Sequence, residues 1–182
     1  MELLSAAVVM IGLLAALNLV LTIGVIRRLR VHTEQLTASL GGIGSPELIL
    51  PAGSAVGEFA ATAESGRVIN LEEPTGLRLI GFFSANCGAC EERLPQFTEH
   101  AATFPGSVLA VAVGAGFATD RLVEALSEVG EVIVEEKGGP MHEALDVSGY
   151  PALALVDAAG KVVASGWDLS AIRPKAEAVA GS

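Results

Sequence analysis

A continuous apolar run of strand length, "LRLIGFFS" from Leu77 to Ser84, is followed within three residues by the first of two cysteines. A strand that is apolar on both faces is typical of a parallel or mixed sheet covered on both sides. A helical pattern then extends from Cys87 to about Ala102. The sequence therefore predicts a buried central strand with Cys87 and Cys90 at its carboxyl end, where open α/β sheets carry their ligands and chemistry.

The rest of this region alternates between strand and helix patterns. Strands are expected at residues 67–71, 108–113, 132–134, 152–156 and 161–165, and helical segments after Thr119 and within 139–145. The connection "DAAGK" between the last two strands has hairpin length. This order predicts an α/β sandwich with mixed strand directions.

The amino-terminal segment from Leu3 to Ile26 contains no charged residue. At helical rise its 24 residues would extend roughly 36 Å, enough to cross a bilayer with some tilt. A signal peptide would have a basic start and a small-residue cleavage site. This chain instead starts Met1-Glu2, and its arginines at 27, 28 and 30 follow the run. We therefore predict an uncleaved anchor over residues 1–30, which contacts the lipid bilayer through residues 3–26.

Two further regions follow the anchor. Residues 31–53 are interpreted as a stalk and linker, in which "GGIGSPE" from Gly41 to Glu47 breaks the helix. Residues 54–182 form the predicted soluble domain. Together residues 31–182 carry 8 basic and 20 acidic residues, a formal net charge of −12. Such a region is repelled by nucleic acid, so no nucleic-acid partner is expected.

The two cysteines are the only ones in the chain. The thiolate is the nucleophile in disulfide exchange, and an ordinary cysteine with a pKa of about 8.5 is mostly protonated at neutral pH. Unpaired N–H groups and the dipole at a helix N-terminus stabilise the anion, so Cys87 is predicted to be the attacking thiol. Cys90, one turn further on, can resolve a mixed disulfide on Cys87.

The alternatives to a redox pair are a structural disulfide and a metal site. A structural disulfide over four residues would constrain the unfolded chain little and stabilise poorly. A zinc site needs about four ligands, and the three histidines, His32, His100 and His142, stand alone in the sequence. Redox activity is the favoured interpretation, with no metal and no cofactor expected.

The segment "FFSANCGACEERLPQF" resembles the active-site segment of thioredoxin-fold proteins, with Phe83 near the usual aromatic position and Pro95 at the proline that kinks the active-site helix. Residues 147–166, "VSGYPALALVDAAGKVVASG", resemble the second half of that fold. The resemblance implies a three-layer α/β/α sandwich with a mixed sheet, which the predicted N-terminal transmembrane helix precedes. It makes Pro151 the family's cis-proline, whose loop faces the cysteines.

The resemblance also implies a substrate-binding surface around the cysteines, made of Tyr150, Pro151 and Asn86. With its anchor and lead-in segment, the chain looks most like membrane-tethered oxidoreductases of the TlpA type, and within these like the methylamine-utilisation (MauD) proteins. Departures are Asn86 in place of Trp, Gly88-Ala89 in place of Gly-Pro, and Gly81 where thioredoxin has a buried Asp. These departures fit a narrower substrate range than that of thioredoxin.

The resemblance places the soluble domain on the extracytoplasmic face of the cell membrane and makes it a reductase of protein disulfides. A membrane electron donor would then have to reduce the cysteines again. The arginines after the span argue for the opposite side by the positive-inside rule. The alternative function is a non-catalytic binding or chaperone module, tethered to the membrane for maturation of a partner protein, and a peroxidase is a weaker alternative. His142 is interpreted as a helix-surface residue, and Trp167 as a packing residue.

Overall fold

The computed structural model describes residues 47–71 and 76–172, together with Met10 and Gly12, which are helical. The chain divides into two units, Met1–Ser45 and Pro46–Ser182, and every strand described below belongs to the second. Within the described residues, no helix is long and apolar enough to cross a membrane. Apart from Met10 and Gly12, the predicted anchor lies outside those residues, as does most of the predicted stalk, so both remain predictions.

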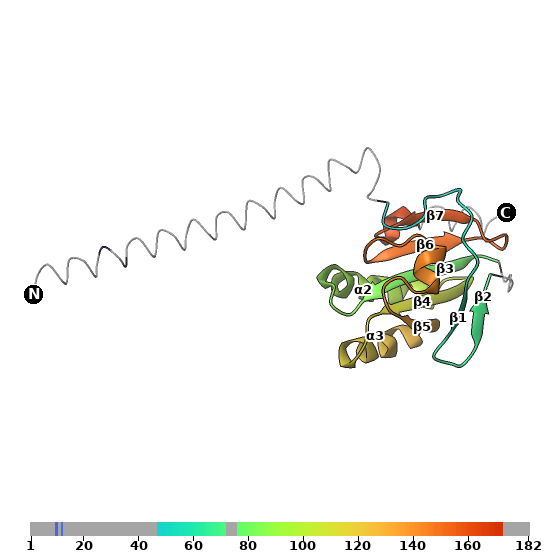
Figure 1. The fold of residues 1–182 in the computed structure, drawn as a ribbon. Helices are drawn as coiled ribbons and strands as arrows, with labels where there is room; N and C mark the ends of the chain where they lie inside the picture. Colours follow the sequence, from blue (N-terminus) through green and yellow to red (C-terminus); the bar gives the residue numbers. More distant parts are fainter. Residues whose placement is uncertain (1–9, 11, 13–46, 72–75, 173–182) are drawn as a thin grey trace, which may run out of the picture. The chain divides into compact units, whose positions relative to one another are not determined.

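A five-stranded mixed sheet forms the centre of the domain (Figure 1). The strand order is β5–β4–β3–β6–β7, and β3 pairs in parallel with β4 and antiparallel with β6. The strands are β3 (Arg78–Ser84), β4 (Ser107–Val113), β5 (Glu131–Glu135), β6 (Ala152–Val156) and β7 (Val162–Gly166). The predicted central strand is therefore central, and the predicted mixture of strand directions is confirmed.

One face of this sheet is covered by α2 (Gly88–Ala102) and α3 (Phe117–Ser127), with the short 3-10 helix η2 (Leu169–Ala171) beside them. Leu79 and Phe83 of β3 point to this face and are fully buried. Since side chains alternate along a strand, Ile80 and Phe82 point to the other face and are equally buried. The continuous apolar run of β3 is thus explained by a layer on each side.

The second face is covered by the short helix α4 (Pro140–Ala144) and by the hairpin of β1 (Ala60–Thr62) and β2 (Val68–Asn70). Strand β2 was predicted, but β1 was not. Ile49, which lies in the predicted linker, is 3% exposed and packs into the core of this face.

The segment of residues 53–64 runs across this second face and reaches both edges of the five-stranded sheet (Figure 1). At the β7 edge, Gly53 donates to the Val162 carbonyl at 2.7 Å, and Val162 donates to the Ser54 carbonyl at 2.9 Å. At the β5 edge, Glu64 donates to the Val132 carbonyl at 2.8 Å. One stretch of chain therefore pairs with part of each edge strand.

Candidate active site

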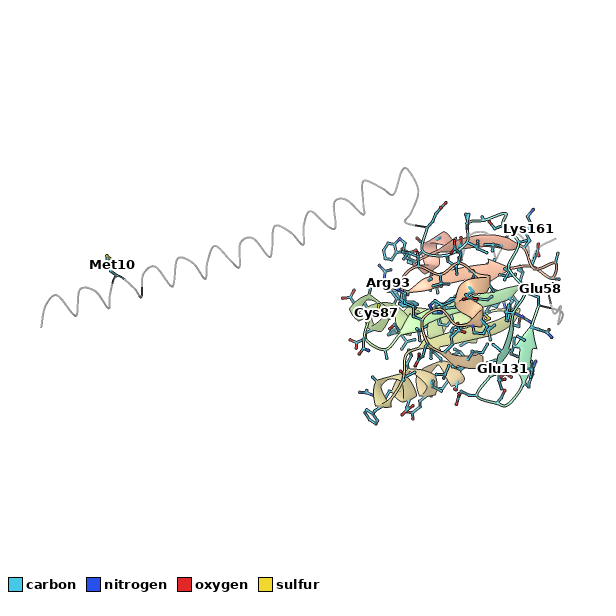
Figure 2. All side chains as sticks on the ribbon, in the orientation of Figure 1. Met10, Glu58, Cys87, Arg93, Glu131 and Lys161 are labelled. Carbon is cyan, nitrogen blue, oxygen red and sulfur yellow. The ribbon has the colours of Figure 1, made fainter. Side chains whose placement is uncertain are left out.

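Cys87 is the N-cap of α2 and lies just beyond the carboxyl end of β3, as predicted. Its backbone is extended, and its Sγ accepts a hydrogen bond from the Cys90 backbone N–H at 3.2 Å. One of the unpaired N–H groups of the first helical turn is thereby directed at sulfur, which favours negative charge there. Figure 2 shows Cys87 on the side of the domain opposite Glu58 and Lys161.

The two thiols differ in exposure. Cys87 is half-buried, whereas Cys90 is 2% exposed, and both are free thiols in this structure. Burial is the main cause that raises the pKa of Cys90 to about 12. A hydrogen bond with the Cys87 side chain and the charges of Cys87 and Glu91 raise this pKa further, and a hydrogen bond with the Ser84 backbone lowers it. Only Cys87 is placed to meet a substrate first.

The space beneath the cysteines is apolar. A Cβ atom at Gly81 would lie 2.8 Å from the Phe97 ring and 2.9 Å from the Phe83 ring, and both rings are buried. The Phe97 side chain of α2 thus fills the volume that a side chain at position 81 would need. This packing explains why glycine stands where thioredoxin has a buried Asp, and it leaves Cys90 without a carboxylate from β3.

The loop before β6 faces Cys87. The Tyr150–Pro151 peptide bond is cis, as the resemblance implied, and Pro151 is buried. The Cys87 thiol donates to the main-chain carbonyl of Tyr150, with 3.6 Å between Sγ and the oxygen. Of the predicted substrate-binding residues, Tyr150 therefore lies against Cys87, and Asn86 is exposed one residue before it. Their predicted role in binding substrate remains a prediction.

The interpretation of His142 as a surface residue was wrong, because its side chain is 3% exposed. Its ring accepts or donates at both nitrogens: Nδ1 lies 3.2 Å from Oε1 of Glu135, and Nε2 is hydrogen-bonded to the Tyr150 hydroxyl. Glu135 ends β5 and is also buried. The sequence indicates the burial of Glu135 only weakly. Glu135 follows Ile133 by two residues, the spacing at which the side chains of a strand point to the same face.

An open cavity of about 480 Å³ lies beside Cys90, between α2 and α3. Its apolar lining includes Leu94, Pro95 and Leu122, and Arg121 contributes a positive charge.

Within the described part of the chain, no group of three or more His, Cys, Asp or Glu side chains could hold a metal ion. Trp167, directly after β7, packs against Arg93 of α2, whose guanidinium carbon lies 4.5 Å from the ring centre.

No protein-family model matches the chain, and no curated protein matches its sequence. Solved structures do match. A protein assigned as the thiol:disulfide interchange protein DsbE from Chlorobium tepidum is 27% identical, with a TM-score of 0.50 over 64% of this chain and 85% of that chain. The thioredoxin domain of a thiol-disulfide oxidoreductase from Bacteroides vulgatus is 21% identical, with a TM-score of 0.56 over 71% of this chain and 97% of that chain.

A third structure, of a thio-disulfide isomerase from Thermus thermophilus, is 17% identical, with a TM-score of 0.57 over 72% of this chain and 96% of that chain. The two matches below 25% identity establish only the fold of the domain. The Chlorobium match, at 27% identity, adds support for thiol–disulfide oxidoreductase activity in general. The domain therefore has a thioredoxin-like α/β fold, and the solved structures that it resembles support a thiol–disulfide oxidoreductase in general.

Proposed function

We propose that this chain is a membrane-tethered thiol–disulfide oxidoreductase that reduces protein disulfides. The observation that carries the proposal is the unequal placement of the two thiols. Cys87 is accessible at the start of α2, whereas Cys90 is 2% exposed one helical turn behind it. A pair with one accessible and one buried thiol suits a two-step exchange, in which the first thiol binds the substrate and the second releases it.

Reduction of a disulfide by this pair takes two steps. The Cys87 thiolate attacks one sulfur of the substrate disulfide, and the other substrate sulfur leaves as a thiolate. Cys90, after losing its proton, attacks Cys87 Sγ, and the remaining substrate sulfur leaves. The dithiol thereby passes two electrons to the substrate and becomes the Cys87–Cys90 disulfide, while its two protons reach the two released thiolates through solvent.

The high pKa of Cys90, about 12, fits the order of these steps. A thiol that stays protonated does not compete with Cys87 for the substrate. In the mixed disulfide Cys87 carries no charge, so its charge no longer raises the pKa of Cys90, whereas burial still does. Resolution is then favoured by proximity, because Cys90 lies three residues from the sulfur that it must attack.

The reducing direction and the location are proposed from the resemblance to TlpA-type proteins. In this proposal residues 3–26 lie in the bilayer and the soluble domain is on the extracytoplasmic face. A membrane electron donor returns two electrons to the Cys87–Cys90 disulfide after each turnover. The tether keeps the domain close to such a donor and raises its effective concentration there.

The test is reduction of a protein disulfide by the purified chain and by two variants. Cys87→Ala is expected to abolish catalysed reduction, and Cys90→Ala is expected to accumulate a mixed disulfide through Cys87. Full turnover by Cys87→Ala would refute the mechanism. If both alanine variants kept the biological function in cells, the tethered binding module would replace the oxidoreductase.

Direction and location can be tested in growing cells. Acid quenching followed by a heavy maleimide should add two adducts to the chain if the pair rests as a dithiol, which a reductase requires. A membrane-impermeant maleimide applied to intact cells should label Cys87 only if the domain is extracytoplasmic. An unlabelled Cys87 that becomes labelled after lysis would place the domain in the cytoplasm.

A further inference from the structure

A chain of hydrogen bonds links the end of β5 to the loop that faces Cys87. Its members are Glu135, His142 and Tyr150, and the Tyr150 carbonyl then accepts from the Cys87 thiol at 3.6 Å. The members come from three different elements: β5, α4 and the loop before β6. Residues that lie far from Cys87 in the sequence are thus linked to the proposed nucleophile by direct contacts.

The part of this network at Glu135 has a structural explanation. Both carboxylate oxygens accept backbone N–H groups from the start of α4, from Met141 and His142, each at 3.1 Å. Gly139 permits this approach, since a Cβ there would lie 2.8 Å from the carboxyl carbon of Glu135. Glu135 therefore pairs N–H groups that would otherwise be buried and unpaired.

These bonds also determine how the imidazole is used. Because the Glu135 oxygens act as acceptors, His142 Nδ1 is the donor in its contact of 3.2 Å. In the neutral ring Nε2 is then an acceptor, and the Tyr150 hydroxyl donates to it. Burial, followed by the charges of Glu135 and Cys90, raises the pKa of Tyr150, so its hydroxyl keeps the proton that it donates.

The aromatic contacts hold the ring in this orientation. His142 packs edge-on against Phe82 of β3 and against Tyr150, with both pairs of ring centres 5.4 Å apart. Phe82 is fully buried in the central strand. The imidazole is thus held between a rigid strand and the loop, and the Tyr150 side chain has a defined place on it.

We propose, on the basis of the function proposed above, that Glu135 and His142 are positioning residues, which hold Tyr150 so that its carbonyl accepts from the Cys87 thiol. This bond exists only while Cys87 carries a hydrogen, because a disulfide sulfur has none to donate. It therefore favours the dithiol over the disulfide form of the pair. Loosening Tyr150 should shift the redox equilibrium toward the disulfide.

The test uses Tyr150→Phe and His142→Asn. The first removes only the hydroxyl and keeps the ring. The second keeps an N–H donor near Glu135 but removes Nε2, the atom that accepts from the Tyr150 hydroxyl. The matched control is Ser127→Ala, which removes a hydroxyl that donates to the Val123 carbonyl within α3. Every protein in the test is full-length, and the measured quantity is the equilibrium constant of the cysteine pair against glutathione.

Each of the two variants is expected to disfavour the dithiol about two- to fivefold, the effect of losing one weak hydrogen bond. For this two-electron couple the shift is about 10–20 mV toward a more negative potential. The double variant should shift no further than either single variant, because both break the same link. The control should match the wild type.

An unchanged equilibrium constant, even in a less stable variant, would overturn the proposal, because the network would then be only structural. A shift toward the dithiol would overturn it as well. The constant can be measured whether or not the wild type reduces protein disulfides. Failure of the wild type to turn over would therefore refute the proposed function and leave the test of Tyr150 readable.

Discussion

The buried thiol of Cys90 should react far more slowly with alkylating reagents than an ordinary cysteine thiol does. At pH 8 a thiol with a pKa of about 12 is ionised to about 10⁻⁴, whereas one with a pKa of about 8.5 is ionised to about 0.24. The more basic thiolate is intrinsically more nucleophilic, which recovers about 25- to 55-fold at a Brønsted slope of 0.4–0.5. Cys90 should therefore react about 40- to 100-fold more slowly than an exposed ordinary thiol, before its 2% exposure slows it further.

The assay is iodoacetamide labelling of the reduced native protein at pH 8, read by mass. A single adduct on Cys87 should form first, and a second adduct should appear only slowly. Labelling of Cys90 should then quicken about tenfold per pH unit as its thiolate fraction rises. In denaturant both cysteines should react at similar rates, because burial is lost.

The matched variant is Cys87→Ala. Burial is the first cause of the high pKa of Cys90, so Cys90 should remain slow in this variant, although the hydrogen bond and charge of Cys87 are gone. Native Cys90 that labelled as fast as Cys87 in the wild type, or as fast as a free thiol in Cys87→Ala, would refute the reasoning. The two-step order proposed above would then lose its physical basis.

Three further changes test the packing. Gly81→Ala places a Cβ 2.8 Å from the buried Phe97 ring, so urea unfolding should show a loss of about 1–3 kcal/mol, and an unchanged midpoint would contradict the packing described here. Leu126→Ala, at a fully buried position of α3, should cost about 2–5 kcal/mol, while Glu124→Ala at an exposed position of the same helix should stay within about 0.5 kcal/mol. Arg93→Ala should cost about 0.5–1 kcal/mol and alter the emission of Trp167, the chain's single tryptophan, whereas an unaltered spectrum would argue against their contact.

The central strand and the cysteine site could be predicted because local signals agree there. Residues 77–84 are apolar at every position that the two faces require, and the cysteines mark the start of the next helix. The cis bond at Pro151 could be predicted only from the family resemblance, because a proline before a strand is ordinarily trans.

Other elements depend on contacts that the sequence does not display. Residues 60–62, Ala-Ala-Thr, have little strand propensity, and β1 forms because it pairs with β2. Helix α3 begins at Phe117 rather than after Thr119. The reason is that Gly116, with a φ of 81°, turns the chain into the helix at the N-cap position, where no side chain caps it. His142 lies in a helix of five residues, too short to show which face is buried.

The segment of residues 53–64 has a consequence for how other chains can join the domain. A sheet edge with unpaired N–H and C=O groups is a template for strand addition, by a peptide partner or by a second copy in an aggregate. In residues 47–71 and 76–172, this one segment hydrogen-bonds to both edge strands, β5 and β7. A truncated protein that starts at residue 65 would lose the whole segment. It would therefore expose unpaired N–H and C=O groups on both edge strands. In the intact domain, the segment blocks strand addition at the parts of β5 and β7 with which it pairs.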